Sequence, residues 1–385
     1  MTDVLYVANA RVPSRKAHVY QILQMCDAFV EVGNDVELVV PRRRQPTSAP
    51  DSVYYDVTMA FNTTRLPCLD LLWLSVPLAA FARAAFYLQT GTFTLASLLY
   101  VTLRDPDIVY TRSRSFAVLG SFLFGKSVVV EVHRRPSHNL ITKITGVSYD
   151  RSRGLVLISE GLENEWQSVT RAPTHVAPDG VDLELFEVQC SKEELRAALE
   201  LPPGPLVCYA GSIQPWKGVD TLVEGAHELE DATVCVVGGT DEQREWLRST
   251  TTLPENLLLV GQVPPDRVPE HLAASDVLVV PNTAKCEISE RYTSPLKLFE
   301  YMAAERPIVA SDLPSLREII DEDTAYFATP DDSVSLAETI ERALTDPDAS
   351  HRARAARERV AEYTWRARAR KISDKFFEER AGGRV

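Results

Sequence analysis

The chain has 385 residues, of which 45% are hydrophobic and 25% charged, so we expect a soluble globular protein with two domains of ordinary size. A formal net charge of −13 argues against nucleic acid as a partner, because a phosphate backbone requires a basic protein face. The six cysteines show no C-x-x-C spacing, which favours a reducing, cytoplasmic compartment and argues against structural zinc.

Short apolar segments alternate with helical patterns, which is typical of parallel sheets covered by helices. The first apolar segment begins at Val4 and leaves no room for a signal peptide. In the first half we expect strands at Val4–Asn9, Val36–Val40, Asp107–Arg112, Ser127–His133, Gly154–Ser159 and His175–Pro178.

The segment from Leu66 to Leu103 is rich in Leu, Ala, Phe and Tyr. The charge-free run Leu71–Ala82 is too short to span a bilayer. We favour buried helices of the first domain. The alternative is a helix pair on a membrane surface, which would place the protein at the inner face of the cell membrane. That pair would expose four residues to lipid: Leu71, Leu72, Trp73 and Leu74.

The second half repeats the alternation. We expect strands at Leu206–Ser212, Thr233–Gly239, Leu257–Val263, Val277–Asn282, Pro307–Asp312 and Ala325–Ala328. We expect helices at Val219–Leu229, Glu242–Ser249, Val268–Ala274, Pro295–Ala304 and Ser315–Ile320.

The proline-rich segment Leu201–Pro205 indicates a linker, because it can join neither a helix nor a strand. The prediction is therefore an α/β protein with two doubly wound, Rossmann-like domains that face each other across a cleft. They comprise residues 1–190 and 200–362, and a C-terminal helix at about 363–385 packs back on the first domain. Ligands of such sheets bind beyond the carboxyl ends of the strands.

In the first half, polar residues follow several predicted strands. Arg11 and His18 flank the start of the first helix, and Arg112 ends the third strand. His133 ends the fourth, in the sequence EVH, where an imidazole can hold a sugar hydroxyl or a developing charge. A structural histidine is the plainer interpretation.

In the second half, a strand ends at Gly211–Ser212, and Lys217 then opens a helix. A lysine at the mouth of a strand–loop–helix unit is placed like a phosphate-binding lysine, although the spacing is not that of a P-loop. Gly239 follows the next strand and permits close approach of a ligand to the backbone. Val263 ends the third strand, where main-chain groups can meet the edge of a base.

The segment RYTSPLKLFEYMAAERPIVAS at residues 291–311 fits the binding of a diphosphate and its neighbouring ribose. Thr293 or Ser294 can cap a helix, Pro295 suits its first position, and the free amides near Leu296 point at an anion. Glu300 can accept hydrogen bonds from two neighbouring hydroxyls. A capped surface helix with an i, i+3 pair between Lys297 and Glu300 is the simpler alternative.

Taken together, these motifs resemble the retaining glycosyltransferases of family 4, which have the two-domain GT-B fold. The resemblance rests on the order and spacing of the loop ARVPSxxAH, EVH, HVAPDGVD (175–182), AGSIQPWKGVD, VGQV, and SPLKLFEYMAAERPIVASDLPSLREII. It implies a hexosyltransferase of glycan biosynthesis that takes its sugar from a nucleotide-diphosphate donor. The acceptor would be a glycan or lipid-linked molecule bound by the first domain through Arg11, His18 and Arg112.

The resemblance also implies a role for individual donor-site residues. Lys217 matches the lysine that binds the donor diphosphate, whereas Ser212 stands where the family often has an arginine, so one positive charge is missing or supplied elsewhere. Val263 matches the position whose backbone meets the base. His133 matches a histidine beside the reacting sugar, which makes it the second catalytic candidate after Lys217.

Glu300 matches the second glutamate of the family's E-x7-E motif, which binds the ribose. The first glutamate, which contacts the transferred sugar, falls at Tyr292 and is absent, as in relatives that have the SPLKLFEYMA variant. The sugar would then be held by amides around Ser294 and Leu296, or by the upstream Glu287 or Glu290.

No D-x-D metal motif follows a strand, so we expect a metal-independent reaction without a cofactor, in which the nucleotide sugar is a co-substrate. Two other classes remain as alternatives: a sugar-nucleotide 2-epimerase on the same fold, and a non-catalytic subunit that binds a sugar nucleotide. The base, the transferred sugar, the acceptor and the oligomeric state do not follow from the sequence.

Overall fold

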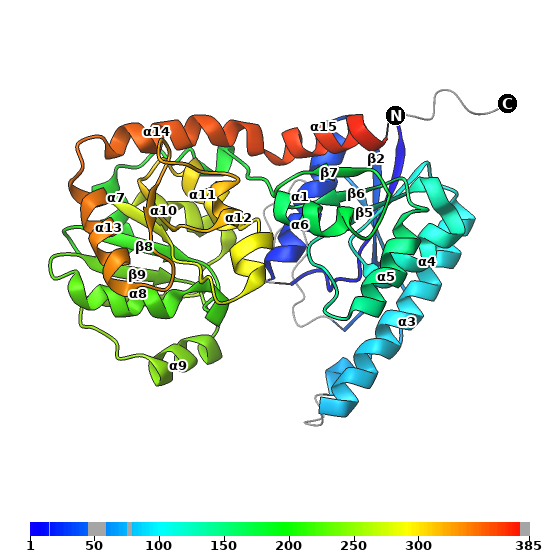
Figure 1. The fold of residues 1–385 in the computed structure, drawn as a ribbon, viewed down its shortest axis with the longest axis horizontal. Coiled ribbons are helices and arrows are strands. Elements are labelled where there is room, and N and C mark those ends of the chain that lie inside the picture. Colours follow the sequence, from blue (N-terminus) through cyan, green and yellow to red (C-terminus); the bar gives the residue numbers. More distant parts are fainter. Residues whose placement is uncertain (15, 45–58, 75–78, 378–385) are drawn as a thin grey trace. The chain divides into compact units, whose positions relative to one another are not determined.

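The computed structural model describes residues 1–14, 16–44, 59–74 and 79–377, and it divides into two compact units. Unit 1 consists of Met1–Ile158, Leu162–Ala177 and the chain from Trp365 onward. Unit 2 consists of Ser159–Gly161 and Pro178–Thr364. Each unit is built on one parallel sheet with helices around it, as the sequence predicts (Figure 1).

Unit 1 contains a seven-stranded sheet in the order β3-β2-β1-β4-β5-β6-β7. All neighbouring strands run parallel. The strands are β1 (Asp3–Val7), β2 (Asp35–Pro41), β3 (Asn62–Leu66), β4 (Ile108–Thr111), β5 (Val128–Val132), β6 (Gly154–Leu157) and β7 (Thr174–Val176). The helices are α1 (Ala17–Glu31), α3 (Ala79–Arg104), α4 (Arg114–Phe124), α5 (Asn139–Tyr149), α6 (Glu160–Gln167) and α15 (Trp365–Phe376).

Unit 2 contains a six-stranded parallel sheet in the order β10-β9-β8-β11-β12-β13. The strands are β8 (Leu206–Ala210), β9 (Thr233–Val237), β10 (Leu257–Gly261), β11 (Val277–Val280), β12 (Ile308–Ser311) and β13 (Tyr326–Ala328). The helices are α7 (Lys192–Ala198), α8 (Val219–Gly225), α9 (Asp241–Thr250), α10 (Val268–Ala273), α11 (Leu296–Ala303), α12 (Pro314–Arg317), α13 (Ser333–Thr345) and α14 (Ala349–Val360).

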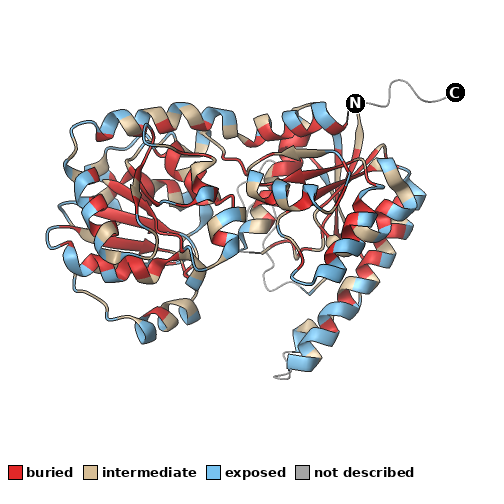
Figure 2. Ribbon diagram, in the orientation of Figure 1, coloured by how far each residue is buried: buried red, intermediate tan, exposed pale blue. Residues whose placement is uncertain are grey.

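The central strands of both sheets are buried on both faces, because helices cover each side (Figure 2). This is why their sequences read as continuous runs of Val, Leu and Ile. The edge strand β3 has the polar sequence NTTRL and was missed for that reason. It is fixed to β2 by a hydrogen bond from Thr64 Oγ1 to Glu37 Oε1, at 2.6 Å.

The boundary between the units lies before the predicted linker Leu201–Pro205, since residues 178–190 belong to unit 2 and not to the first domain. The amide of Asp179 donates a hydrogen bond to Ser294 Oγ at 2.9 Å, and the amide of Val181 donates to the Tyr363 carbonyl at 2.9 Å. These contacts attach the segment to unit 2 well ahead of the prolines. At the other end of the chain, α15 returns to unit 1 and packs along α1. Residues 378–385 of the predicted C-terminal helix lie outside the described part.

The segment from Leu66 to Leu103 differs from the favoured prediction of buried helices. Instead of a helix pair, the described residues form one short turn at Leu72–Leu74 and the single long helix α3; residues 75–78 lie outside the described part. Trp73 and Leu74 are exposed, whereas Leu71 and Leu72 are half-buried. Much of α3 also presents apolar side chains to solvent, so burial is the wrong interpretation for its outer face.

Candidate functional site

In unit 2, glycines bring the carboxyl ends of three neighbouring strands together. The amide of Gly211, just after β8, donates to the Val237 carbonyl at 2.8 Å, and the amide of Gly238 donates to the Gly261 carbonyl at 2.6 Å. A Cβ atom on Gly238 would lie 2.2 Å from the Gly211 carbonyl oxygen, so only glycine fits there. The backbones after β8, β9 and β10 therefore form one continuous edge of main-chain groups, at which Gly239 also lies.

Lys217 is held at this edge by a loop that presses against the end of β11. Gly218, which follows it, has a φ of +66°, and a Cβ atom there would lie 1.8 Å from the Pro281 carbonyl oxygen. The Lys217 ammonium lies 3.9 Å from the centre of the Trp216 ring. Burial lowers the pKa of Lys217 to about 8. A partly desolvated ammonium of this kind favours an anionic ligand, because the ligand's negative charge would stabilise the charged form.

A second lysine, Lys297 in the first turn of α11, approaches the same edge. It is only 6% exposed, and its Nζ lies 4.2 Å from the centre of the Tyr209 ring. Nζ has no hydrogen-bond partner among the described residues. Burial and the neighbouring charge of Lys217 lower the pKa of Lys297 well below its usual value. From the sequence, Lys297 is expected only as one half of an ion pair with Glu300, so its place beside Lys217 is not predicted.

Glu300 lies one turn further along α11 and is half-buried. Burial raises the pKa of its carboxyl group to about 7, although the charge of Lys297 opposes the shift. The next residue, Tyr301, attaches the helix to β8, because its hydroxyl accepts a hydrogen bond from the amide of Ala210 at 2.6 Å. The structure therefore brings Lys217, Lys297 and Glu300 together near the carboxyl end of β8.

The start of α11 differs from the predicted capping. The helix begins at Leu296, one residue later than predicted, and Pro295 occupies the N-cap position without a side-chain cap. Ser294 does not cap the helix, because its Oγ accepts the hydrogen bond from Asp179 instead. Thr293 is buried beside it. The first amides of α11, at Leu296 and Lys297, remain available to a ligand, since the first turn of a helix leaves its N–H groups without helical partners.

Ser212 helps to fix the loop that carries Lys217, and Val263 packs against the core of unit 2. The Ser212 carbonyl accepts a hydrogen bond from the Tyr209 hydroxyl at 2.8 Å, which fixes the loop that carries Lys217. Val263 follows β10, which ends at Gly261 and not at Val263, and it is half-buried against the core of unit 2.

The segment before α11 places the residues considered for the sugar. A π-helical turn covers Ile288–Tyr292, and the Tyr292 carbonyl accepts a hydrogen bond from Ser159 Oγ at 3.3 Å. Glu287 is exposed. Glu290 is half-buried and pairs with its neighbour Arg291 at 3.6 Å. A role of either glutamate in holding the sugar remains a prediction.

In unit 1, His133 belongs to a buried polar cluster at the carboxyl ends of β4 and β5. Its Nε2 lies 2.5 Å from Glu131 Oε1. Glu131 also accepts hydrogen bonds from the Tyr110 hydroxyl and from Gln21, and its Oε2 lies 3.4 Å from the guanidinium of Arg368 in α15. Although burial acts to raise it, the charge of Arg368 and the hydrogen bond with His133 hold the pKa of Glu131 well below its usual value.

Two of the three predicted acceptor residues lie beside this cluster. Arg112 donates hydrogen bonds to Gln21 Oε1 and to the His18 carbonyl. Burial and the charge of Arg112 lower the pKa of His18 to about 4, and the same two causes lower the pKa of His133 to about 4. Both imidazoles are therefore neutral at pH 7. Arg11 is half-buried elsewhere, with the charges of Arg43 and Asp70 near it.

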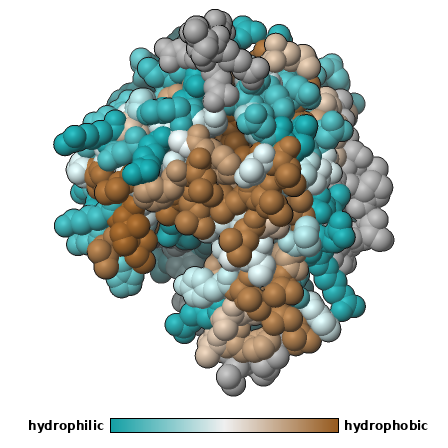
Figure 3. Space-filling model, turned by 90° about the vertical axis from the view of Figure 1, so that its right-hand side faces the viewer, coloured by the Kyte–Doolittle hydropathy of each residue, from teal (hydrophilic) through white to brown (hydrophobic). Residues whose placement is uncertain are grey.

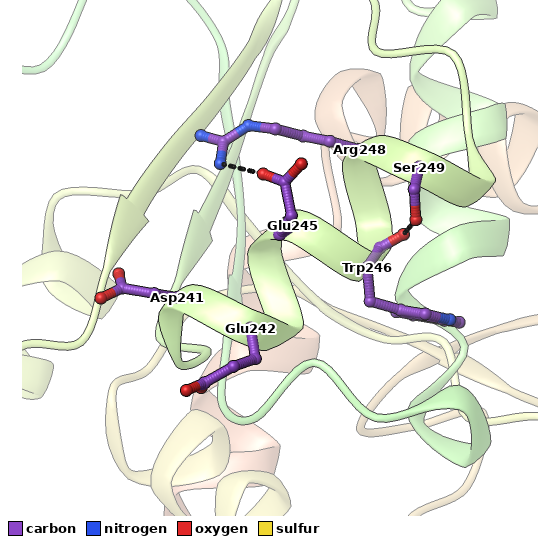
Figure 4. Close-up of a pocket in the computed structure, with 6 residues that line it drawn as sticks. All are labelled: Asp241, Glu242, Glu245, Trp246, Arg248 and Ser249. Atoms are coloured by element: carbon purple, nitrogen blue, oxygen red, sulfur yellow. Dashed lines mark hydrogen bonds and ion pairs between the residues drawn. The ribbon is translucent and has the colours of Figure 1, made fainter.

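A surface hollow beside α9 offers no alternative site. It is lined by residues of that one helix: Asp241, Glu242, Glu245, Trp246, Arg248 and Ser249 (Figure 4). Arg248 and Glu245 point toward each other and form an ion pair at 3.7 Å, whereas Trp246 points away from them. No strand end contributes to this lining, so the hollow lacks the converging polar groups of a ligand site. Among the residues that the structure describes, no cluster of three or more His, Cys, Asp or Glu side chains could hold a metal ion.

Sequence comparison matches part of the chain to a family of glycosyl transferases. Residues 204–346, which include Lys217, Lys297 and Glu300, match the family model described as Glycosyl transferases group 1. The chain is 25% identical over 190 residues to a putative teichuronic acid biosynthesis glycosyltransferase, TuaC, of Bacillus subtilis, covering 49% of this chain and 46% of that protein. The chain spans about half the length of the curated relatives it matches.

Solved structures share the fold over the whole chain. Sucrose-phosphate synthase from Thermosynechococcus elongatus aligns with a TM-score of 0.78 at 22% identity, covering 99% of this chain and 100% of that one. Anabaena Alr3699/HepE in complex with UDP-glucose aligns with a TM-score of 0.73 at 16% identity, covering 97% and 99%. The two parallel-sheet α/β units are thus those typical of GT-B glycosyltransferases, and the predicted fold class is confirmed.

Proposed function

We propose that the protein is a retaining, family 4-like glycosyltransferase that moves a hexosyl group from a nucleotide-diphosphate sugar to a glycan or lipid-linked acceptor. The observation that carries this proposal is the pair of desolvated lysines, Lys217 and Lys297, at the carboxyl end of β8. A bound diphosphate would give these two neighbouring amino groups the anionic partner that would stabilise their charged forms. The match of residues 204–346 to group 1 glycosyl transferases and the UDP-glucose complex of Alr3699/HepE support this reading.

Glycosyl transfer requires stabilisation of a departing diphosphate and of a cationic, oxocarbenium-like sugar. Lys217, Lys297 and the first amides of α11 would bind the developing phosphate charge. One such preorganised donor typically contributes about 3–4 kcal/mol to transition-state stabilisation. The proposal needs no metal ion. We infer attack on the same face of the sugar, in which the leaving phosphate oxygen takes the acceptor's proton and the configuration is retained.

Other residues would position the two substrates. The Glu300 carboxylate would accept hydrogen bonds from the ribose hydroxyls, and Val263 would meet the base through its main chain. Neutral His133, held by Glu131, would contact the transferred sugar. His18 and Arg112, which lie near it in unit 1, are the better acceptor candidates than Arg11. A peripheral position at the inner face of the cytoplasmic membrane would suit a lipid-linked acceptor.

The test uses purified full-length protein and a set of nucleotide sugars that includes UDP-glucose. Wild type should slowly release nucleoside diphosphate by hydrolysis, and Lys217→Ala should lower that rate by a factor on the order of 100–1000 while the melting temperature stays close to that of wild type. Lys192→Ala is the matched control, because Lys192 pairs with Asp276 at the opposite, amino edge of the sheet, at 2.6 Å. Near-normal release by Lys217→Ala would refute the assignment. Binding of the sugar nucleotide without any release by wild type would instead identify a non-catalytic binding subunit, the alternative favoured by Tyr292.

A further inference from the structure

Three neighbouring helices of unit 1 carry large apolar side chains on the outside. The exposed fraction is 62% for Leu99 and 76% for Leu103 in α3, 65% for Leu123 in α4, and 70% for Leu140 in α5. Leu95 in α3 and Ile144 in α5 are also exposed. Helix α4 packs against both α3 and α5, so these six residues belong to one continuous surface, which we call the outer face. Figure 3 shows it as a broad apolar region that continues along the projecting helix α3.

The inner side of α3 combines apolar residues such as Phe93 and Val101 with polar residues whose hydrogen bonds orient the helix. Gln89 donates a hydrogen bond to Asn9 Oδ1 at 3.0 Å, and Thr94 Oγ1 lies 2.9 Å from Ser115 Oγ. Ser97 is fully buried. Rotating α3 to bury its leucines would break these hydrogen bonds and expose their partners. The leucines are therefore held outward by the fold itself.

The inner side of α5 also carries polar residues. Thr142, Thr145 and Ser148 are buried, and Ser148 Oγ donates a hydrogen bond to the Val118 carbonyl of α4 at 2.6 Å. Exposed leucines occur singly on most proteins, but three adjacent helices that all expose large apolar side chains form a patch that marks an interaction surface.

The charges on these helices are of one sign. Across α3, α4 and α5 the sequence contains Arg83, Arg104, Arg114 and Lys143 and no Asp or Glu, whereas the whole chain has 54 acidic and 41 basic residues. Arg104 forms an ion pair with Glu37 of β2 at 3.2 Å, so the other three are the candidates for contact with an anionic surface. Just beyond α5, the exposed Asp150 is followed by Arg151, whose guanidinium lies 4.7 Å from the centre of the exposed Phe122 ring in α4. A cationic margin around an apolar surface, on an otherwise strongly acidic protein, is complementary to an anionic lipid headgroup layer.

We propose that the outer face is a membrane-docking surface, which places its apolar side chains among the headgroups of an anionic phospholipid bilayer while Arg83 and Lys143 contact lipid phosphates. None of the described helices is both long enough and apolar enough to cross a bilayer, so α3 would lie on the surface instead of spanning it. This surface includes α4 and α5, which the sequence did not indicate. If the docked protein takes a lipid-linked acceptor from the membrane, that step rests on the proposed function. The docking of the outer face to the membrane does not rest on it.

The test measures the binding of the full chain to vesicles by co-sedimentation. We expect binding to vesicles of phosphatidylglycerol and phosphatidylcholine in equal parts, and much weaker binding to phosphatidylcholine alone. Leu99→Glu with Leu123→Glu should weaken binding by a factor on the order of ten or more, because each places a carboxylate in the headgroup layer. Arg83→Gln with Lys143→Gln should weaken binding to the anionic vesicles and reduce its dependence on salt.

The matched control is Val334→Glu, since Val334 is 54% exposed at the start of α13 in unit 2, outside the outer face. It should bind vesicles like wild type. All variants should release nucleoside diphosphate at the wild-type rate when vesicles are absent, so a failure of docking and a failure of the proposed function are distinguished. Equal binding to both kinds of vesicle, or to neither, would overturn the proposal. Self-association that Leu99→Glu with Leu123→Glu abolishes, without vesicle binding, would assign the surface to a second copy of the chain.

Discussion

The pKa values at the candidate site predict that a nucleoside diphosphate binds together with protons. Lys217 has a pKa of about 8, so at pH 8 about half of the free protein carries a proton on this side chain. A bound diphosphate favours the ammonium form, and therefore draws in about half a proton from solvent at this residue. Lys297 contributes an uptake of the same sign, because its pKa is lowered too.

The proton uptake on binding should shrink or reverse in acid. At pH 6 Lys217 is already protonated, whereas Glu300, with a pKa of about 7, is mostly neutral in the free protein. Ribose hydroxyls that donate to Glu300 favour its carboxylate form, so binding releases protons from this residue. We therefore expect net uptake at pH 8, and a smaller uptake or a net release at pH 6.

The assay is titration calorimetry in buffers that differ in ionisation enthalpy. The ligand is whichever of UDP, GDP and ADP raises the melting temperature most. The arginine of Lys217→Arg stays protonated throughout this range, so the variant should bind the ligand with about half a proton less uptake at pH 8. Lys192→Arg should behave like wild type. A binding enthalpy that is independent of the buffer at pH 8, or an uptake unchanged in Lys217→Arg, would refute the reasoning.

Two further substitutions test the buried charges. Lys297→Met removes a buried amino group without a described hydrogen-bond partner, so it should raise the free energy of unfolding by about 1–3 kcal/mol. It should also weaken diphosphate binding by roughly 10–100-fold. Thermal denaturation measures the first effect and calorimetry the second, and a variant less stable than wild type would contradict the prediction. Arg368→Ala leaves Glu131 buried without its guanidinium and should cost about 3–5 kcal/mol in urea denaturation. Arg368→Met combined with Glu131→Gln should recover part of that loss, and a double variant no more stable than Arg368→Ala would show that the ion pair is not the cause.

Local sequence determined much of this protein. The alternation of apolar runs with helical patterns fixed the two parallel sheets, because both periodicities are local properties of the chain. Gly211 and Gly239 marked strand ends for the same reason, since their backbone conformations have positive φ. Lys217 was recognisable because a strand, a loop and a helix follow one another there within a few residues.

Only the tertiary structure decided the rest, because it depends on contacts between distant segments. Lys297 belongs to the site since the fold stacks it on Tyr209 and brings it near Lys217, which helical spacing cannot show. Arg368 reaches Glu131 across 237 positions of the sequence. Leu95, Leu99 and Leu103 of α3 lie outside because polar side chains on the opposite side of the helix find hydrogen-bond partners within unit 1. A sequence pattern reveals that a helix has two faces, but the packing around it selects which face is buried.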